Sequence, residues 1–191
     1  EAVVALDVRT ELDPDAFGGR VGSSVAGDVH VLRIAADAHA VHRTASLIAR
    51  APQRYVKFSL VERGHGLIAQ DGRETPLAPG DMTIYDTDRP YSLVFDDDVR
   101  MSIVMFPPAA LELPAPQIDR LTATRLDRSP GIGDVVRPCL TALARRAGDW
   151  DGRVARSLLR STVEMIGTLL TAELEHADPL GAHDALLRDI T

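Results

Sequence analysis

The sequence predicts an α+β fold that is mainly β, with antiparallel strands forming a sandwich or barrel before two helices. Between about residues 29 and 106 the apolar residues come in runs of roughly five to eight, separated by turn residues. After Pro107-Pro108 the pattern changes, and apolar residues recur at helical spacing. Short connections between successive strands exclude an alternating βαβ architecture.

The clearest strand pair is a hairpin over 66–77. Asp71-Gly72 lies between its strands, and Asp-Gly favours a type I′ turn because both central residues need positive φ. This register pairs Gln70 with Arg73. A Pro-Gly-Asp turn at 79–81 then leads to strands predicted over 82–86, 91–95 and 99–106.

Alternation along 55–60 predicts a strand with two distinct faces. Val56, Phe58 and Leu60 share one face, and Tyr55, Lys57 and Ser59 share the other. Because alternate strand residues line the pockets of β-barrels, polar and aromatic strand residues are candidate ligand-binding groups. These candidates are Arg33, His39, Arg43, Tyr55, Lys57, Tyr85, Tyr91 and Phe106. Such Arg, Tyr and His side chains gathered at one end of a barrel would favour a carboxylated, phenolic or other polar organic ligand.

Two helices are predicted in the C-terminal region, the second from about residue 151 to 176. Its basic residues come early and its acidic residues late, against the helix dipole, so an antiparallel second copy would match opposite charges. Solvated surface charge is the alternative explanation. The candidate dimerisation residues are Arg156, Leu159, Val163, Ile166, Leu170 and Glu173.

We therefore divide the chain into four parts. Residues 1–113 are a β-barrel with an N-terminal arm, and residues 114–130 are a proline-containing connector with at most one helical turn. Residues 131–177 are a helical hairpin, and residues 178–191 begin a linker. A new amphipathic pattern starts near residue 183 and simply stops, so we expect the natural protein to continue.

The composition excludes several classes of protein. With 21 basic and 28 acidic residues the net charge is −7, so this chain is not expected to hold nucleic acid by charge alone. It shows no signal peptide and no apolar run near the roughly 18 residues of a membrane span. The single cysteine, Cys139, excludes an internal disulfide and fits a reducing, cytoplasmic location.

No residue pattern indicates a catalytic or metal centre, and no cofactor is expected. His39 and His42 are close in sequence, but the strand after 79–81 offers no imidazole as a further metal ligand. Cys139 lies on an apolar helical stripe, which is typical of a buried, inert thiol. The glycines form neither a phosphate-binding loop nor a dinucleotide fingerprint, and no serine occupies a Gly-x-Ser-x-Gly elbow.

Several segments, in order along most of the chain, carry a family resemblance. They are Val41-His42-Arg43-Thr44 with Ile48-Ala49, the continuous stretch QDGRETPLAPGDMTIYDTDRPY at 70–91, and Phe106-Pro107. This pattern resembles the N-terminal sensing domain of AraC-family bacterial transcription regulators. Pro108 departs from it, because relatives often carry a basic residue after Phe-Pro.

The resemblance implies a cupin-like jelly-roll barrel that binds a small-molecule effector, followed by a helical pair that forms a homodimer. It also implies a separate C-terminal domain with two helix-turn-helix units that binds DNA, which this sequence does not contain. Catalysis and a membrane are not expected. The alternatives are a stand-alone, metal-free cupin enzyme of isomerase or lyase type, with two titratable groups facing each other inside the barrel, and a carrier module.

Overall fold

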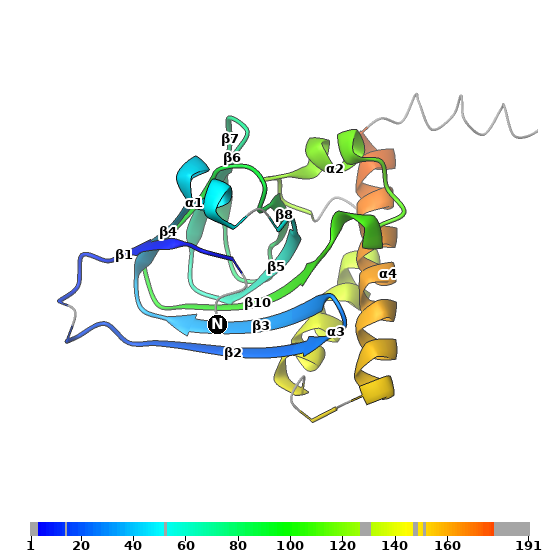
Figure 1. Cartoon of the computed structure of the whole chain (residues 1–191), viewed down its shortest axis with the longest axis horizontal. Coiled ribbons are helices and arrows are strands. Elements are labelled where there is room, and N and C mark those ends of the chain that lie inside the picture. The colour runs from blue at the N-terminus through cyan, green and yellow to red at the C-terminus, as the bar shows by residue number, and fades with distance from the viewer. Residues whose placement is uncertain are drawn as a thin grey trace, which may run out of the picture.

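The computed structural model describes residues 4–13, 15–51, 53–126, 131–146, 149–150 and 152–177. Within them, two five-stranded antiparallel sheets face each other, and helices pack along one side (Figure 1). Sheet A has the order β1 (Asp7–Arg9), β4 (His39–Arg43), β9 (Tyr91–Phe95), β6 (Gly66–Gln70), β7 (Arg73–Leu77). Sheet B has the order β2 (Gly19–Ala26), β3 (Val29–Ala36), β10 (Val99–Phe106), β5 (Val56–Arg63), β8 (Met82–Asp86).

The predicted mainly-β, jelly-roll fold class is confirmed. The two sheets are hydrogen-bonded separately, so the molecule is a two-sheet jelly roll rather than a barrel closed by a continuous ladder. The hairpin register is also as predicted, since Gln70 lies opposite Arg73. Asp71 and Gly72 have φ values of +55° and +73°, as a type I′ turn requires.

The buried residues of sheet B divide into two clusters on opposite faces. One face packs on the helices and includes Val56, Phe58 and Leu60; we call it the helix-facing cluster. The other face looks into the space between the two sheets and contributes Tyr85 and Met101 to what we call the interior cluster. The alternation predicted along β5 therefore separates these two environments.

The helices that follow the last strand pack on the outer face of sheet B. They are the 3₁₀ helix η1 (Pro108–Ala110), α2 (Ala115–Leu121), α3 (Ile132–Arg146) and α4 (Gly152–Ala177). A short helix, α1 (Ala45–Arg50), lies between β4 and β5. In Figure 1, α4 stands at the side of the molecule, with α3 beside it. Its apolar stripe lies in the helix-facing cluster, so α4 is an integral part of the core.

The connector differs from the prediction in one respect. Helix α2 has seven residues, about two turns, where at most one turn was expected. Pro114 and Pro116 do not prevent it, because they lie at its start, where a missing N–H has no helical partner to lose. The linker predicted for 178–191 lies outside the described residues.

The described part of the N-terminal arm lies against one end of the jelly roll. Val4 is buried and forms a small apolar cluster with Tyr55 and Met105. The carbonyl of Ala5 accepts a hydrogen bond from Arg43 at 2.8 Å. The arm is thus packed on the same end of the interior at which β5 begins.

Candidate functional site

Polar side chains gather at one end of the space between the sheets. The sheet B register places His30, Met105, Lys57 and Tyr85 side by side on four adjacent strands. All four point into the interior, because their neighbours along each strand belong to the helix-facing cluster. Tyr91 approaches the same place from sheet A.

We call Lys57, Ser59, Thr83, Tyr85 and Tyr91 the Lys57 cluster. Nζ of Lys57 donates to the Tyr91 hydroxyl at 3.1 Å, and the hydroxyls of Ser59 and Tyr85 are 3.0 Å apart. The two tyrosine rings have centroids 4.8 Å apart, and Nζ of Lys57 is 6.0 and 5.7 Å from them. A buried cation thus lies beside two π faces and one hydroxyl.

Burial in this cluster destabilises the charged form of Lys57 and keeps the two tyrosine hydroxyls protonated. Burial lowers the pKa of Lys57 to about 8, and the like charge of Arg43 adds to the effect. Burial raises the pKa of Tyr85 to about 12 and that of Tyr91 well above its usual range. At neutral pH the cluster therefore presents an ammonium and neutral hydroxyls, all of which are hydrogen-bond donors.

Arg43 lies next to this cluster, and its side chain hydrogen-bonds to backbone carbonyls from several segments. Its guanidinium donates to the carbonyls of Thr87 (3.1 Å), Ala5 (2.8 Å), Leu47 (3.2 Å) and Ala51 (3.1 Å). These bonds join the arm, α1 and the β8–β9 turn. Because its donors bind these carbonyls, Arg43 stabilises the segments around the end of the jelly roll, which we call the rim, rather than facing a ligand.

A surface hollow lies over the outer face of sheet A, next to the end of the jelly roll that holds Tyr91. It has a volume of about 710 Å³ and is lined by residues of β4, α1, β6, β7 and β9. Tyr91 belongs both to this hollow and to the cluster, and Arg43 and Gln70 form part of the same rim. Its volume is within the range of small-molecule sites, and Tyr91 is the residue that it shares with the Lys57 cluster.

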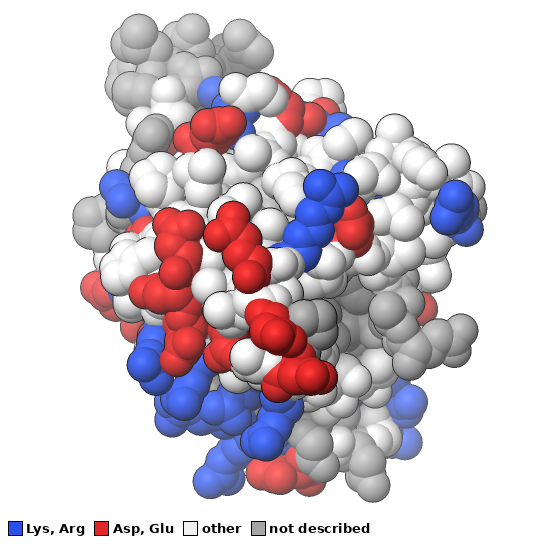
Figure 2. Space-filling view, turned by 90° about the vertical axis from the view of Figure 1, so that its left-hand side faces the viewer, with Lys and Arg blue, Asp and Glu red and all other residues white. Residues whose placement is uncertain are grey.

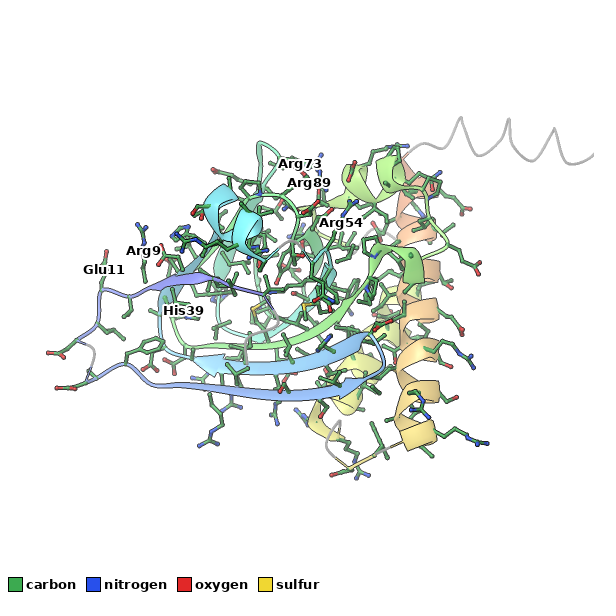
Figure 3. All side chains as sticks on the ribbon, viewed as in Figure 1. Arg9, Glu11, His39, Arg54, Arg73 and Arg89 are labelled. Carbon is green, nitrogen blue, oxygen red and sulfur yellow. The ribbon has the colours of Figure 1, made fainter. Side chains whose placement is uncertain are left out.

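The structure separates the other sequence candidates from the cluster. Tyr55 is buried at the arm end, with its ring against His30 at 5.5 Å between centroids. His39 lies at the opposite end of β4 from Arg43, about 13 Å away along the strand, and packs against Phe17 and Phe95 (Figure 3).

Two candidates point away from the interior. Arg33 is exposed on the outer face of β3, opposite Ser102. Phe106 is fully buried, but in the helix-facing cluster. Their strands were correctly predicted, yet only the packing of the helices reveals which face of sheet B is the interior.

Three interior residues were not among the candidates. Ser59 and Thr83 share the inward face of β5 and β8 with Lys57 and Tyr85, and His30 lies one strand beyond Met105. Thr83 Oγ1 and His30 Nδ1 are buried without a hydrogen-bond partner among the described residues. The alternation along β5 already contained Ser59, but the pairing with β8 and β3 was needed to find the other two.

Five of the six dimerisation candidates are buried within the chain. Leu159, Val163, Ile166 and Leu170 are buried against sheet B and the neighbouring helices, and Glu173 is buried with them. The apolar stripe of this amphipathic helix therefore packs within its own chain. Arg156 alone of the six is exposed.

An ion-pair network joins the hairpin tip to the helices. Arg54, Arg73 and Arg89 lie together at the end of the molecule beside α2 (Figure 3). Arg89 bridges Asp71 at 2.6 Å and Asp119 of α2 at 2.8 Å, and Arg73 donates to the Asp119 carbonyl at 2.6 Å. The rim of the jelly roll is thereby connected to the helical layer.

The side of the molecule away from α4 is acidic across its middle (Figure 2). A hollow of about 650 Å³ there is lined by residues that include Asp37, Asp96, Asp97 and Asp98. Among the described residues, no group of three or more His, Cys, Asp or Glu side chains is arranged to hold a metal ion. None of the helices in the described part of the chain is long and apolar enough to cross a membrane.

The fold and the site define the class: a two-sheet jelly-roll domain with a polar interior cluster and a packed helical layer. The chain belongs to the family described as the AraC-binding-like domain, whose model matches residues 1–171. The resemblance found in the sequence is confirmed, and the chain is an effector-binding domain of the AraC type.

Two known proteins are similar to this chain over most of its length. An uncharacterized protein in the nit 5′ region of Bacillus sp. (strain OxB-1) is 29% identical over 175 residues, which cover 90% of this chain and 66% of that protein. The transcriptional activator NphR of Rhodococcus sp. is 29% identical over 160 residues, covering 83% of this chain and 48% of NphR. The chain thus spans about half to two thirds of these relatives.

The AraC-like transcriptional activator CuxR has a similar structure. It superposes with a TM-score of 0.77 at 17% identity, covering 87% of this chain and 61% of CuxR. At that identity the match shows the shared fold.

Proposed function

We propose that this chain is the effector-sensing and dimerising part of a bacterial transcription regulator, and that it has no catalytic activity. The observation that carries the proposal is the Lys57 cluster: a buried cation and hydroxyl groups in the interior of an AraC-type domain. Polar groups without a structural task in a buried interior are typical of a binding site. In the whole protein, a further domain would bind DNA.

The effector would reach the cluster past Tyr91 and alter the packing of the rim. Two elements at that rim are suited to transmit the change: the arm, which Arg43 holds through Ala5, and the Arg89 bridge between the hairpin tip and α2. A ligand shifts the equilibrium between two arrangements only by its difference in affinity for them, typically about 1–3 kcal/mol.

A screen of the folded protein tests the sensing role. Thermal unfolding would be followed with a panel of organic acids, sugars, amines and neutral aromatic compounds. We expect at least one class to raise the unfolding temperature with saturable dose dependence, because a ligand that binds only the folded state stabilises it. No response from any class would contradict the proposal.

For the homodimer we propose a different face of α4 from the one predicted. Val154, Leu158, Ser161, Met165, Thr168 and Ala172 form an exposed or half-buried stripe. Their spacing alternates between four and three residues, as in the contact seam of a coiled coil. Val154 and Leu158 are 58% and 38% exposed, and a groove of about 980 Å³ borders the same helix at Thr168 and Ala172.

Sedimentation of two glutamate variants tests this face. Leu158→Glu places a charge in the stripe and should weaken self-association by about tenfold or more, since a buried unpaired charge is costly. Val94→Glu adds the same charge to an exposed position on the outer face of sheet A, away from α4, and should leave association unchanged. A monomeric wild type, or equal self-association of the two variants, would contradict a dimer formed through this stripe.

One observation favours the alternative function, a metal-free enzyme. Lys57 and Tyr91 are two titratable groups that face each other at 3.1 Å inside the jelly roll, as a metal-free acid–base site would require. Incubation of the protein with each compound that binds, followed by NMR of the compound, separates the two functions. A sensor leaves the compound unchanged, whereas an isomerase or lyase converts it.

A further inference from the structure

We propose that the Lys57 cluster binds the carboxylate of a small organic acid, and that this acid is the class of effector the domain senses. The inference rests on the proposed sensing function and narrows it to one ligand chemistry. Its basis is the balance of hydrogen-bond donors and charge in the interior.

The cluster contains more hydrogen-bond donors than acceptors. The ammonium of Lys57 has three N–H groups, and Tyr91 accepts one of them. The Tyr91 hydroxyl, acting as acceptor, still has its own proton to donate. Ser59 and Tyr85 share a single hydrogen bond between two hydroxyls, so one proton of that pair is also unused.

Thr83 provides an independent observation at the same place. Its side chain is fully buried on the inward face of β8, next to Tyr85 and opposite Ser59. Its Oγ1 has no hydrogen-bond partner among the described residues. Buried hydroxyls are almost always hydrogen-bonded, so an unpartnered one beside unused donors marks a place where a polar ligand is missing.

The charge of the cluster has no counterpart within the described chain. Burial and the like-charged Arg43 are the influences that lower the pKa of Lys57, and no carboxylate acts on it to raise it. A buried ammonium without an anionic partner is unfavourable, so the site gains most from a ligand that carries a negative charge. A carboxylate also offers several lone pairs, which match the several unused donors.

The residues around the Lys57 cluster indicate what the rest of the acid, apart from its carboxylate, is like. Met101, Ile103 and Met105 line the interior on β10, the strand next to β5, which carries Lys57. Methionine and lysine chains are unbranched and rearrange readily, and the tyrosine rings offer flat apolar faces. The body of the acid is therefore compact and apolar, aromatic or aliphatic. A sugar fits poorly, because its hydroxyls need acceptors as well as donors.

Matched acid and amide pairs test the inference. We would measure binding of benzoate against benzamide, phenylacetate against phenylacetamide and hexanoate against hexanamide by calorimetry and thermal shift. At least one acid should bind the wild type, and its amide should bind about tenfold or more weakly, since one buried charge-assisted hydrogen bond contributes at least that factor.

Three variants locate the site. Lys57→Met keeps the length of the side chain without its charge and should weaken binding of the acid by about tenfold or more. Tyr91→Phe, which removes one donor, should weaken it to a smaller extent. Arg33→Met removes a cation from the outer face of sheet B and should leave binding unchanged. Cooperative thermal unfolding of each variant shows that it is folded.

The possible failures are distinguishable. If an amide binds as tightly as its acid, or if Lys57→Met retains the acid affinity, the carboxylate site is refuted while sensing stands. The same holds if only sugars, amines or other neutral compounds bind. If no compound of any class binds the folded wild type, both the inference and the proposed function fall.

Discussion

Replacing Lys57 by methionine should stabilise the ligand-free protein at neutral pH. The wild type keeps a charged amine in the interior beside Arg43, and its acceptor is the neutral hydroxyl of Tyr91. Methionine fills a similar volume without a charge to desolvate, and unbranched thioether chains adapt well to a core that already contains Met101 and Met105.

The size of the effect follows from the pKa of Lys57. Its value in the folded protein is about 8, against an ordinary value of 10.5. Between these two pH values the unfolded chain binds the extra proton, so stability rises with pH across that window and the full cost of the charge is present below it. At about 1.4 kcal/mol per pH unit, this cost is about 3 kcal/mol. Loss of the Tyr91 hydrogen bond offsets about 1 kcal/mol, leaving a net gain of about 2 kcal/mol.

Urea unfolding of both proteins between pH 7 and 9.5 measures the effect. The wild type should gain stability as the pH rises above about 8, and Lys57→Met should lack that gain. Tyr85 and Tyr91 lower stability above about pH 10, but they are present in both proteins and cancel in the difference. A variant less stable than the wild type at pH 7, or equal pH slopes for the two, would refute the reasoning.

Two further substitutions test the scaffold around the site. Arg43→Met should lower the free energy of unfolding by about 3–5 kcal/mol because four backbone carbonyls lose their donor, whereas the exposed Arg33→Met should change it by less than about 0.5 kcal/mol. A loss below about 1 kcal/mol for Arg43→Met in urea unfolding would show that the anchor is dispensable. Gly64→Ala places a Cβ 2.3 Å from the Asp98 carbonyl oxygen, at φ +84°, while Gly27→Ala meets open space at φ +66°. Thermal unfolding should show a penalty of about 1 kcal/mol for Gly27→Ala and at least about 2 kcal/mol more for Gly64→Ala; equal penalties would argue against that close approach.

Local sequence patterns predicted much of the fold. Asp71-Gly72 fixes its hairpin through two residues that tolerate positive φ, and the alternation along β5 separates Lys57 from Phe58 without knowledge of any other strand. The helix predicted from about 151 to 176 is α4 at Gly152–Ala177. These features depend on neighbours in sequence, which is why they are accessible from sequence.

The candidate site was only partly predictable. Both faces of β5 and β10 are buried, so alternation could not tell the interior from the helix-facing side, on which Phe106 lies. Thr83 was missed because its importance depends on its register opposite Ser59. An apolar stripe on a helix such as α4 does not reveal whether it packs within its own chain or against another.

The four methionines of the chain provide the most direct test of where the effector binds. Met101 and Met105 lie in the interior, Met82 lies in the helix-facing cluster, and Met165 lies on the proposed dimer stripe of α4. With ¹³C-methyl methionine, titration of an acid that stabilises the protein should shift the Met101 and Met105 resonances with the same saturation curve as the thermal response. Unchanged Met101 and Met105 resonances at saturation, whatever happens at Met82 or Met165, would contradict an interior effector site.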